Sequence, residues 1–235
     1  MNIFIIPSWY PSQGNPIAGI FFKEQATYIA ELYKNVNVGI SLWGQSDHTL
    51  MLNKNLAASL KNLATAITEK RTTETNSLSS NLHEIKSPTL NWTHKILAGN
   101  ISKVVEANVR NFTKFEQQFG KVDILHAHVS YPAGYVAMVL AEKFNIPYVI
   151  TEHMGPFPFK TFITGKGKIY PKLAEPLRKA DAVVAVSPTL AEDMAKSGFR
   201  RPSFIPNVIN EDLFSVKTTA PPSPFIFFTL ASISQ

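Results

Sequence analysis

Short apolar segments alternate with longer segments of helical periodicity along most of this 235-residue chain. The apolar segments predict strands at residues 2–7, 36–42, 82–86, 123–126, 148–151, 182–186 and 203–205. Between the first two, one helical face is formed by Phe22, Ala26, Ile29, Ala30 and Tyr33, and this face has to pack against a sheet. Strands that are apolar on both faces and alternate with helices form parallel sheets. The sequence therefore predicts an α/β fold with a doubly wound parallel sheet.

One segment departs from this alternation. Residues 47–81 are rich in Asn, Ser, Thr and Lys and lack a clear apolar period. We expect this segment to be partly helical and to form an excursion from the α/β pattern.

The composition limits the chemistry that the chain can perform. It has no cysteine, which excludes disulfide bonds, thiolate catalysis and Cys-ligated zinc or iron-sulfur sites. A formal net charge of +6 and a pI near 9.4 favour anionic partners such as nucleic acid, lipid headgroups or phosphorylated small molecules. No run approaches the ~20 apolar residues that span a bilayer, and the N-terminal apolar stretch lacks the basic leader of a signal peptide. We therefore expect a cytoplasmic globular protein.

The loop between the first strand and the helix that starts at Ile20 carries Gly14 and Gly19. Their G-x-x-x-x-G spacing is that of a phosphate loop, but Ile20 and Phe21 follow where such a loop has Lys and Ser/Thr. The G-x-G-x-x-G pattern is also absent, which argues against a dinucleotide cofactor. Two interpretations of Gly19 stay open: it serves only the turn, or it lets backbone N–H groups approach an anionic ligand.

Polar residues end two other predicted strands. One strand ends in the pair His126 and His128, and the next ends in Glu152 and His153. Because the carboxyl ends of parallel strands share one edge of a sheet, we expect His128, Glu152, His153 and Gly19 to converge on one cleft. His126, nearer the strand interior, is predicted to be a hydrogen-bonded core histidine. The H-E-x-x-H pattern is absent, so we expect no metal site.

The last part of the chain indicates a domain boundary. Ser187 is a candidate helix N-cap, with Pro188 at the favoured first helical position. Prolines stiffen the stretch at 218–224, which is typical of a linker, and a new apolar segment follows it. We predict an N-terminal domain at residues 1–214, a linker at 215–224 and the first strand of a further domain at 225–235.

Five motifs, in their order and spacing, resemble the retaining, nucleotide-sugar-dependent glycosyltransferases of family four. They are the glycine loop at 16–19, the strand end at 123–128, the strand-end His153, the helix-strand junction at 180–187 and the segment 205–207. The resemblance covers nearly the whole chain and implies a Rossmann-like N-terminal lobe, the acceptor side of a two-lobed GT-B fold. It also implies that a second lobe, beginning at Phe225, would hold the nucleotide sugar.

The resemblance implies roles for individual residues. Gly19 would let its loop approach the donor phosphate and the acceptor, with His128 and Asn207 as further binding residues. His153 would line the cleft beside the transferred sugar and assist a reaction in which the nucleotide diphosphate leaves and configuration is retained. Glu152 is the second catalytic candidate, although a carboxylate beside a cleft histidine can instead fix its tautomer. No metal or cofactor is expected, because the nucleotide sugar is a co-substrate.

The segment from Lys160 to Lys179 is basic, with aromatic residues among its lysines. One interpretation is a solvated helix face, since scattered lysines are ordinary on surfaces. The other is contact with an anionic acceptor or with the inner face of a membrane, to which each lysine contributes on the order of 1 kcal/mol. No nucleic-acid recognition module accompanies the segment, so we do not expect nucleic acid as a partner.

Together these features predict the N-terminal domain of a retaining, hexosyl-type glycosyltransferase that uses a nucleotide sugar and a glycan or lipid-linked acceptor. Two alternatives stay open: a nucleotide-sugar epimerase of the same fold, and a non-catalytic α/β module that binds a ligand or partner. We expect the 235-residue chain alone to be inactive, because the resemblance assigns the diphosphate-binding groups to the second lobe.

Overall fold

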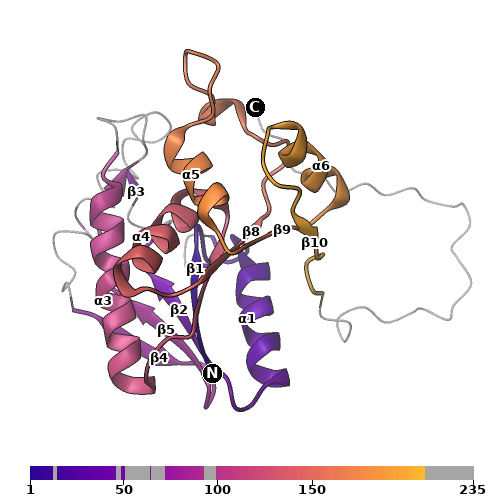
Figure 1. The fold of residues 1–235 in the computed structure, drawn as a ribbon. Helices are drawn as coiled ribbons and strands as arrows, with labels where there is room; N and C mark the ends of the chain where they lie inside the picture. The colour runs from indigo at the N-terminus through magenta and orange to yellow at the C-terminus, as the bar shows by residue number, and fades with distance from the viewer. Residues whose placement is uncertain (13–14, 46–48, 51–63, 65–71, 93–98, 210–235) are drawn as a thin grey trace, which may run out of the picture.

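The computed structural model describes residues 1–12, 15–45, 49–50, 64, 72–92 and 99–209 (Figure 1). Its main sheet has eight strands in the order β10-β9-β8-β7-β1-β2-β5-β4. Their bounds are β1 Asn2–Pro7, β2 Asn37–Leu42, β4 Glu74–Ser77, β5 Leu82–Lys86, β7 Ile124–His128, β8 Tyr148–Glu152, β9 Ala182–Ala185 and β10 Ser203–Phe204. A separate two-stranded sheet pairs β3 (Thr49–Leu50) with β6 (Asn91–Trp92).

Helices cover the sheet on both faces, and α1 lies opposite α3 and α4 (Figure 1). The α-helices are α1 Ile20–Leu32, α3 Ile101–Phe119, α4 Tyr135–Phe144, α5 Pro171–Lys179 and α6 Pro188–Lys196. A π-helical turn, Ser130–Gly134, precedes α4, and a 3-10 turn, Lys160–Phe162, precedes α5. The doubly wound α/β fold predicted from the alternation of elements is confirmed.

The sheet is mixed rather than wholly parallel, because β4 runs antiparallel to β5 while the other paired strands of this sheet run parallel. Within the segment 47–81, which we expect to be partly helical, residue 64 is helical and residues 74–77 form this edge strand, which the sequence did not predict. The side chains of β4 are mostly exposed, so the strand has no apolar alternation that a sequence reading could detect. Residues 47–48, 51–63 and 65–71 of that segment lie outside the described part.

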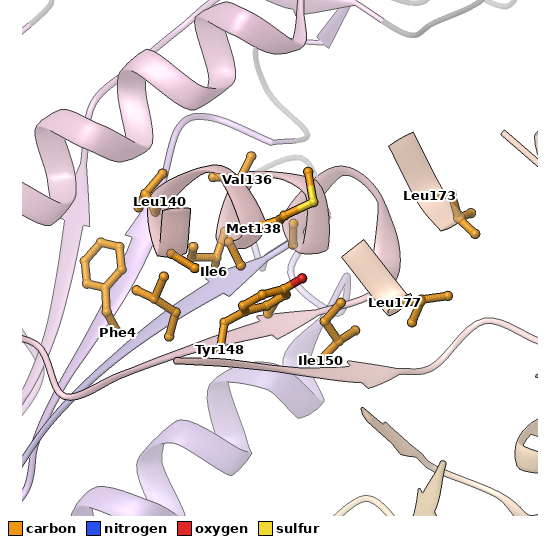
Figure 2. Close-up of a cluster of buried hydrophobic side chains, with 14 of the residues drawn as sticks. Phe4, Ile6, Val136, Met138, Leu140, Tyr148, Ile150, Leu173 and Leu177 are labelled. Carbon is orange, nitrogen blue, oxygen red and sulfur yellow. The ribbon is translucent and has the colours of Figure 1, made fainter. Parts of the chain in front are cut away.

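The alternating side chains of β1 divide the core into two layers. Phe4 and Ile6 pack with α3 and α4, whereas Ile5 packs with α1. Figure 2 shows the larger layer, where Val136 and Leu140 of α4 and Leu173 and Leu177 of α5 surround the sheet residues. β1 is thus buried on both faces, as its continuous apolar run predicted.

Other predictions about the helices have mixed outcomes. The N-cap is confirmed, because the Leu190 N–H donates to Ser187 Oγ at 3.1 Å. The prediction that Tyr33 faces the sheet from α1 is wrong, because the helix ends at Leu32 and Tyr33 is 53% exposed.

Residues 160–179 are not one solvated helix face, since only 171–179 are α-helical and a β-bridge joins Ile163 to Ile169. The proposed linker and the strand at 225–235 lie outside the described residues and stay predictions.

A close contact between β2 and α3 supports a stability prediction. A Cβ built on Gly39 would lie 2.5 Å from Cδ2 of Phe115, whose ring is fully buried. Gly39→Ala should therefore lower the free energy of unfolding by about 1–3 kcal/mol, the usual cost of overpacking a core. Gly165→Ala is the matched control, because nothing lies within 4 Å of its added Cβ. Urea denaturation should separate the two variants, and equal stabilities would show that the α3 contact is looser than described.

Candidate active site at the β1–β7 switch point

The carboxyl ends of β1 and β7 meet at the centre of the sheet. From β1 the chain proceeds outward to β2 on one side, and it later returns to β7 on the other side. Ligands of open α/β sheets bind at such a switch point. Ser8, just after β1, donates from its hydroxyl to the carbonyl of His128 at 2.9 Å and accepts from the N–H of Ala133 at 3.2 Å. These hydrogen bonds hold the ends of the two strands and the start of the following turn together.

Two histidines from neighbouring strands meet at this point. Nδ1 of His128 and Nε2 of His153 are 3.1 Å apart, a hydrogen bond between imidazoles. His128 Nε2 and His153 Nδ1 are buried and have no hydrogen-bond partner among the described residues. Because a neutral imidazole has one N–H and one lone pair, the pair leaves one donor and one acceptor unsatisfied, whichever ring donates. Buried groups left unsatisfied in this way are rare in folded proteins and require an explanation, such as a catalytic role or an ordered water.

The first residues of α1 pack against the histidine pair. The ring of Phe22 stacks on His128 with centroids 4.5 Å apart, and the ring of Phe21 lies 5.0 Å from that of His153. His126 and His128 face α1 because the alternate residues of β7, Leu125 and Ala127, belong to the opposite layer. The aromatic residues therefore exclude water from the imidazoles.

Glu152 connects the loops that follow β7 and β8. One carboxylate oxygen accepts hydrogen bonds from the N–H and hydroxyl of Ser130, and the other accepts from the N–H groups of His153 and Met154. Its side chain is buried, and it contacts the backbone of His153 rather than the imidazole. These contacts indicate a positioning role. The catalytic role expected for Glu152 stays a prediction, and no contact indicates that it fixes the tautomer of His153.

The turn that Glu152 holds is strained. Val129, directly after His128, has a φ of 78°, a region that β-branched residues rarely adopt. Its N–H donates to the carbonyl of Thr151 at 2.8 Å, and its carbonyl accepts from Gly134 at 3.0 Å. Backbone strain of this kind clusters at functional sites and persists only where surrounding contacts enforce it.

Burial keeps the histidines of this site neutral. It lowers the pKa of His153 to about 3 and that of His126 to about 4. Burial is also the main cause that holds the pKa of His128 well below its ordinary value, and its neighbours His126 and His153 lower it further. For Glu152, burial raises the pKa, and hydrogen bonds from Ser130, Met154 and His153 oppose that rise.

The predicted site residues are only partly brought together. His128 and His153 are in contact, and Gly19 lies close to them through Phe22, whose ring a Cβ on Gly19 would approach to 3.0 Å. Asn207 follows β10, three strands away from β7, and is exposed. His126 makes the hydrogen bond predicted for it, with Nε2 2.8 Å from Oγ1 of Thr151.

Gly19 has a structural reason of its own. Its φ is 66°, and an added Cβ would lie 2.8 Å from the carbonyl oxygen of Trp9. This glycine therefore allows the loop to pack under the start of α1, and substitution would disturb that packing. Its contact with a ligand stays a prediction, and Gly14 lies outside the described residues.

Sequence reasoning missed several residues of the site. Ser8, Ser130 and the rings of Phe21 and Phe22 were not predicted to belong to the site, because serine and phenylalanine are ordinary at loop and helix positions. The signal for Phe22 was present, since it lies three residues after Gly19 and on the buried face of α1.

Two findings concern other classes of site. Within the described ranges, no three or more His, Cys, Asp or Glu side chains gather where they could hold a metal ion. None of the helices described is long and apolar enough to cross a membrane.

Residues 69–213, more than half of the chain, match the family model for Glycosyltransferase Family 4. The chain therefore belongs to this family. No curated protein matches it.

Comparison with solved structures identifies the fold of the chain. The chain is similar to Arabidopsis thaliana UGT89C1 complexed with UDP, at 10% identity and a TM-score of 0.50, over 86% of this chain and 50% of that one. It is also similar to LpCGTa in complex with UDP, at 11% identity and a TM-score of 0.49, over 91% of this chain and 54% of that one. The chain thus spans about half the length of both proteins. Its fold is that of the N-terminal lobe of a GT-B glycosyltransferase, which confirms the resemblance.

The lowered pKa values predict how stability depends on pH. The unfolded histidines take up protons near pH 6.5, whereas folded His126 and His153 do so only near pH 4 and 3. The free energy of unfolding should therefore fall as the pH is lowered from 7.5 to 5, with a limiting slope of about 1.4 kcal/mol per pH unit for each such histidine.

Urea denaturation at several pH values measures this slope. Near pH 5.5, His153→Gln should lower the slope by close to the contribution of one histidine, because the unfolded state then takes up about one proton fewer. An unchanged slope in His153→Gln would show that this imidazole is already protonated in the folded protein.

Proposed function

We propose that the chain is the acceptor-side lobe of a retaining glycosyltransferase that moves a hexosyl-type sugar from a nucleotide sugar to a glycan or lipid-linked glycan. The observation that carries the proposal is the His128–His153 pair, buried at the switch point, where one nitrogen of each ring has no partner in the part of the chain that the structure describes. Family membership makes sugar transfer the reaction to which such a site belongs.

In this proposal His153 acts on the donor side of the reaction. Its low pKa keeps the imidazole neutral at pH 7, so it can offer a hydrogen bond to the transferred sugar or the leaving diphosphate without carrying a charge. Glu152 contributes indirectly, because it fixes the backbone N–H of His153 and the turn after His128. A positioned group of this type acts by electrostatic preorganisation.

The donor is proposed to be a nucleoside diphosphate sugar. Both similar structures were solved with UDP, which supports a nucleotide diphosphate as the leaving group. We propose that a second, donor-binding lobe supplies most of the contacts to it, since the chain spans about half of those proteins. From the N-terminal lobe, which this chain forms, Gly19 and Asn207 are proposed to contribute further contacts to the donor.

The role of His153 can be tested in the longest open reading frame that contains this chain. His153→Ala should lower kcat for sugar transfer by about a hundredfold or more, the scale of losing one preorganised electrostatic group. The assay measures transfer from a panel of nucleotide sugars, with the melting temperature recorded for each variant.

His83→Ala is the matched control, because His83 is also buried, with an Nε2 that no described residue hydrogen-bonds, but lies on β5 against Phe119. It should change stability and leave kcat near that of the wild type. Wild-type kcat in folded His153→Ala would remove this residue from the mechanism. Transfer by the 235-residue chain alone would overturn the two-lobe proposal.

We further propose that the protein works at the cytoplasmic face of a membrane, held by a basic hairpin at residues 160–170. This hairpin is closed by hydrogen bonds from Thr164 to Lys168 and from Tyr170 to Phe162. Lys160, Lys166 and Lys168 are exposed, and the segment 154–174 contains no Asp or Glu.

Two basic side chains near the end of the segment 160–179 already contact other residues of the chain. Lys179 forms ion pairs with Glu142 and Glu175, at 2.9 and 2.8 Å. Arg178 lies over the ring of Phe199, 5.2 Å from its centroid. The membrane proposal therefore depends on the hairpin and not on the end of α5.

Liposome sedimentation tests the hairpin. The protein should bind vesicles that contain phosphatidylserine and should be released by salt, because attraction at an exposed surface fades beyond about 8 Å at physiological ionic strength. Lys166→Glu/Lys168→Glu should abolish the binding.

Lys34→Glu/Lys121→Glu is the control, with the same change of net charge at exposed sites outside the hairpin. Equal loss in both double variants would indicate attraction through net charge alone. Equal recovery of the wild type on neutral and anionic vesicles would remove the membrane from the proposal.

A further inference from the structure

A groove of about 480 Å³ opens at the carboxyl ends of β2 and β5, on the same edge of the sheet as the histidine pair. Its polar lining comes from separate elements: Tyr10 and Ser12 follow β1, Lys23 lies in α1, Gln45 follows β2, and Glu84 and Lys86 lie in β5. None of the residues predicted from the sequence to form the active site lines this groove.

Glu84 is the central polar group of the groove. Its Oε1 accepts a hydrogen bond from the phenol of Tyr10 at 2.8 Å and lies 3.6 Å from Nζ of Lys23. Its Oε2 accepts from the side-chain amide of Asn76 in β4 at 3.0 Å. Only 14% of its side chain is exposed, so these contacts hold the carboxylate in a fixed direction. Burial and the nearby carboxylate raise the pKa of Tyr10 above its ordinary value, so the phenol stays a donor even at alkaline pH.

A carboxylate held in this way selects the chemistry of a ligand. Each ionised carboxylate oxygen can accept about two hydrogen bonds, and Oε2 receives one from the described residues. A ligand has to donate to this position, which a sugar hydroxyl does and a phosphate or carboxylate anion does not. Lys23 offsets the charge of Glu84 at short range, and Lys86 lies on the same strand as Glu84, so the position beside Oε2 selects a ligand group by its ability to donate rather than by its charge. The chemistry fits a neutral polyol.

The groove and the histidine pair share one wall. The ring of Trp9 packs against Phe22, which stacks on His128, and the next residue, Tyr10, lines the groove. A molecule in the groove therefore lies against the same loop that borders the pair. The antiparallel strand β4 adds Asn76 to this arrangement, so the unpredicted edge strand helps to hold Glu84.

We propose that this groove is a subsite for a neutral, hydroxyl-bearing sugar of the acceptor, with Glu84 accepting a hydrogen bond from a sugar hydroxyl. The assignment of this sugar to the acceptor rests on the proposed function. The claim that the groove binds a sugar is independent of the proposed function. Glu84 acts here as a specificity residue, since the position beside its carboxylate admits groups that donate and disfavours a carboxylate or phosphate oxygen there.

Saturation-transfer NMR on the 235-residue chain tests the subsite. The test ligands are the methyl glycosides of glucose, galactose, mannose and N-acetylglucosamine, and methyl glucuronide is the anionic comparison. At least one neutral glycoside should receive saturation, and the glucuronide should receive less. Glu84→Gln should lower the signal at least fivefold, because one carboxylate oxygen is replaced by a donor.

Two further variants keep the result interpretable. Lys23→Gln, at a residue whose side chain is 37% exposed, should fold normally and weaken the same signal. Glu106→Gln, exposed on α3, should leave it unchanged. Absence of saturation in every neutral glycoside, a stronger signal for the glucuronide, or equal signals in wild type, Glu84→Gln and Lys23→Gln would each overturn the subsite.

Kinetics on the longest open reading frame separate this inference from the proposed function. Glu84→Gln should raise KM for the acceptor at least tenfold and leave KM for the nucleotide sugar unchanged. Sugar transfer that depends on His153 but not on Glu84 would overturn the subsite and keep the proposed function. Glycoside binding that depends on Glu84, in a protein that transfers no sugar, would overturn the proposed function and keep the sugar-binding groove.

Discussion

The carboxylate of Glu152 is the contact on which the rest of the site depends. It receives N–H donors from the loops after β7 and β8 and the hydroxyl of Ser130. A buried carboxylate is costly unless hydrogen bonds satisfy it, and here it is satisfied by backbone groups that would otherwise also be unpaired. The strained turn at Val129 and the position of His153 follow from this one side chain.

The neutral state of the histidines follows from the same packing. His128 and His153 lie beneath the aromatic start of α1, where burial disfavours the imidazolium form. The loop from β1 to α1 makes two contacts: Trp9 packs against Phe22 of the aromatic start of α1, and Tyr10 donates a hydrogen bond to Glu84. The β1 loop thus joins the candidate catalytic residues to the groove, and Gly19 lets it come close enough to do so.

The outcome for individual elements shows where sequence reasoning succeeded and where it failed. Buried strands such as β1 and β5 were located to the residue, because an apolar run between turn signals is a local pattern. β7 ends at His128, two residues beyond its predicted end at 126, because pairing with β1 and not local propensity extends it. The exposed edge strand β4 was missed for the same reason, since its partner is β5 and its own side chains carry no pattern.

By itself, the sequence determined the α/β class, the parallel direction of the buried strands and the gathering of His128 and His153 at one edge, because buried strands that alternate with helices run parallel and end at the same edge. Only the tertiary structure decided what the polar residues do. Glu152 became a clamp because it is buried among N–H donors, and Gly19 became a packing residue because Trp9 lies against it. The groove around Glu84 depends on groups 8 and 74 residues away in sequence, and no local pattern encodes such a contact.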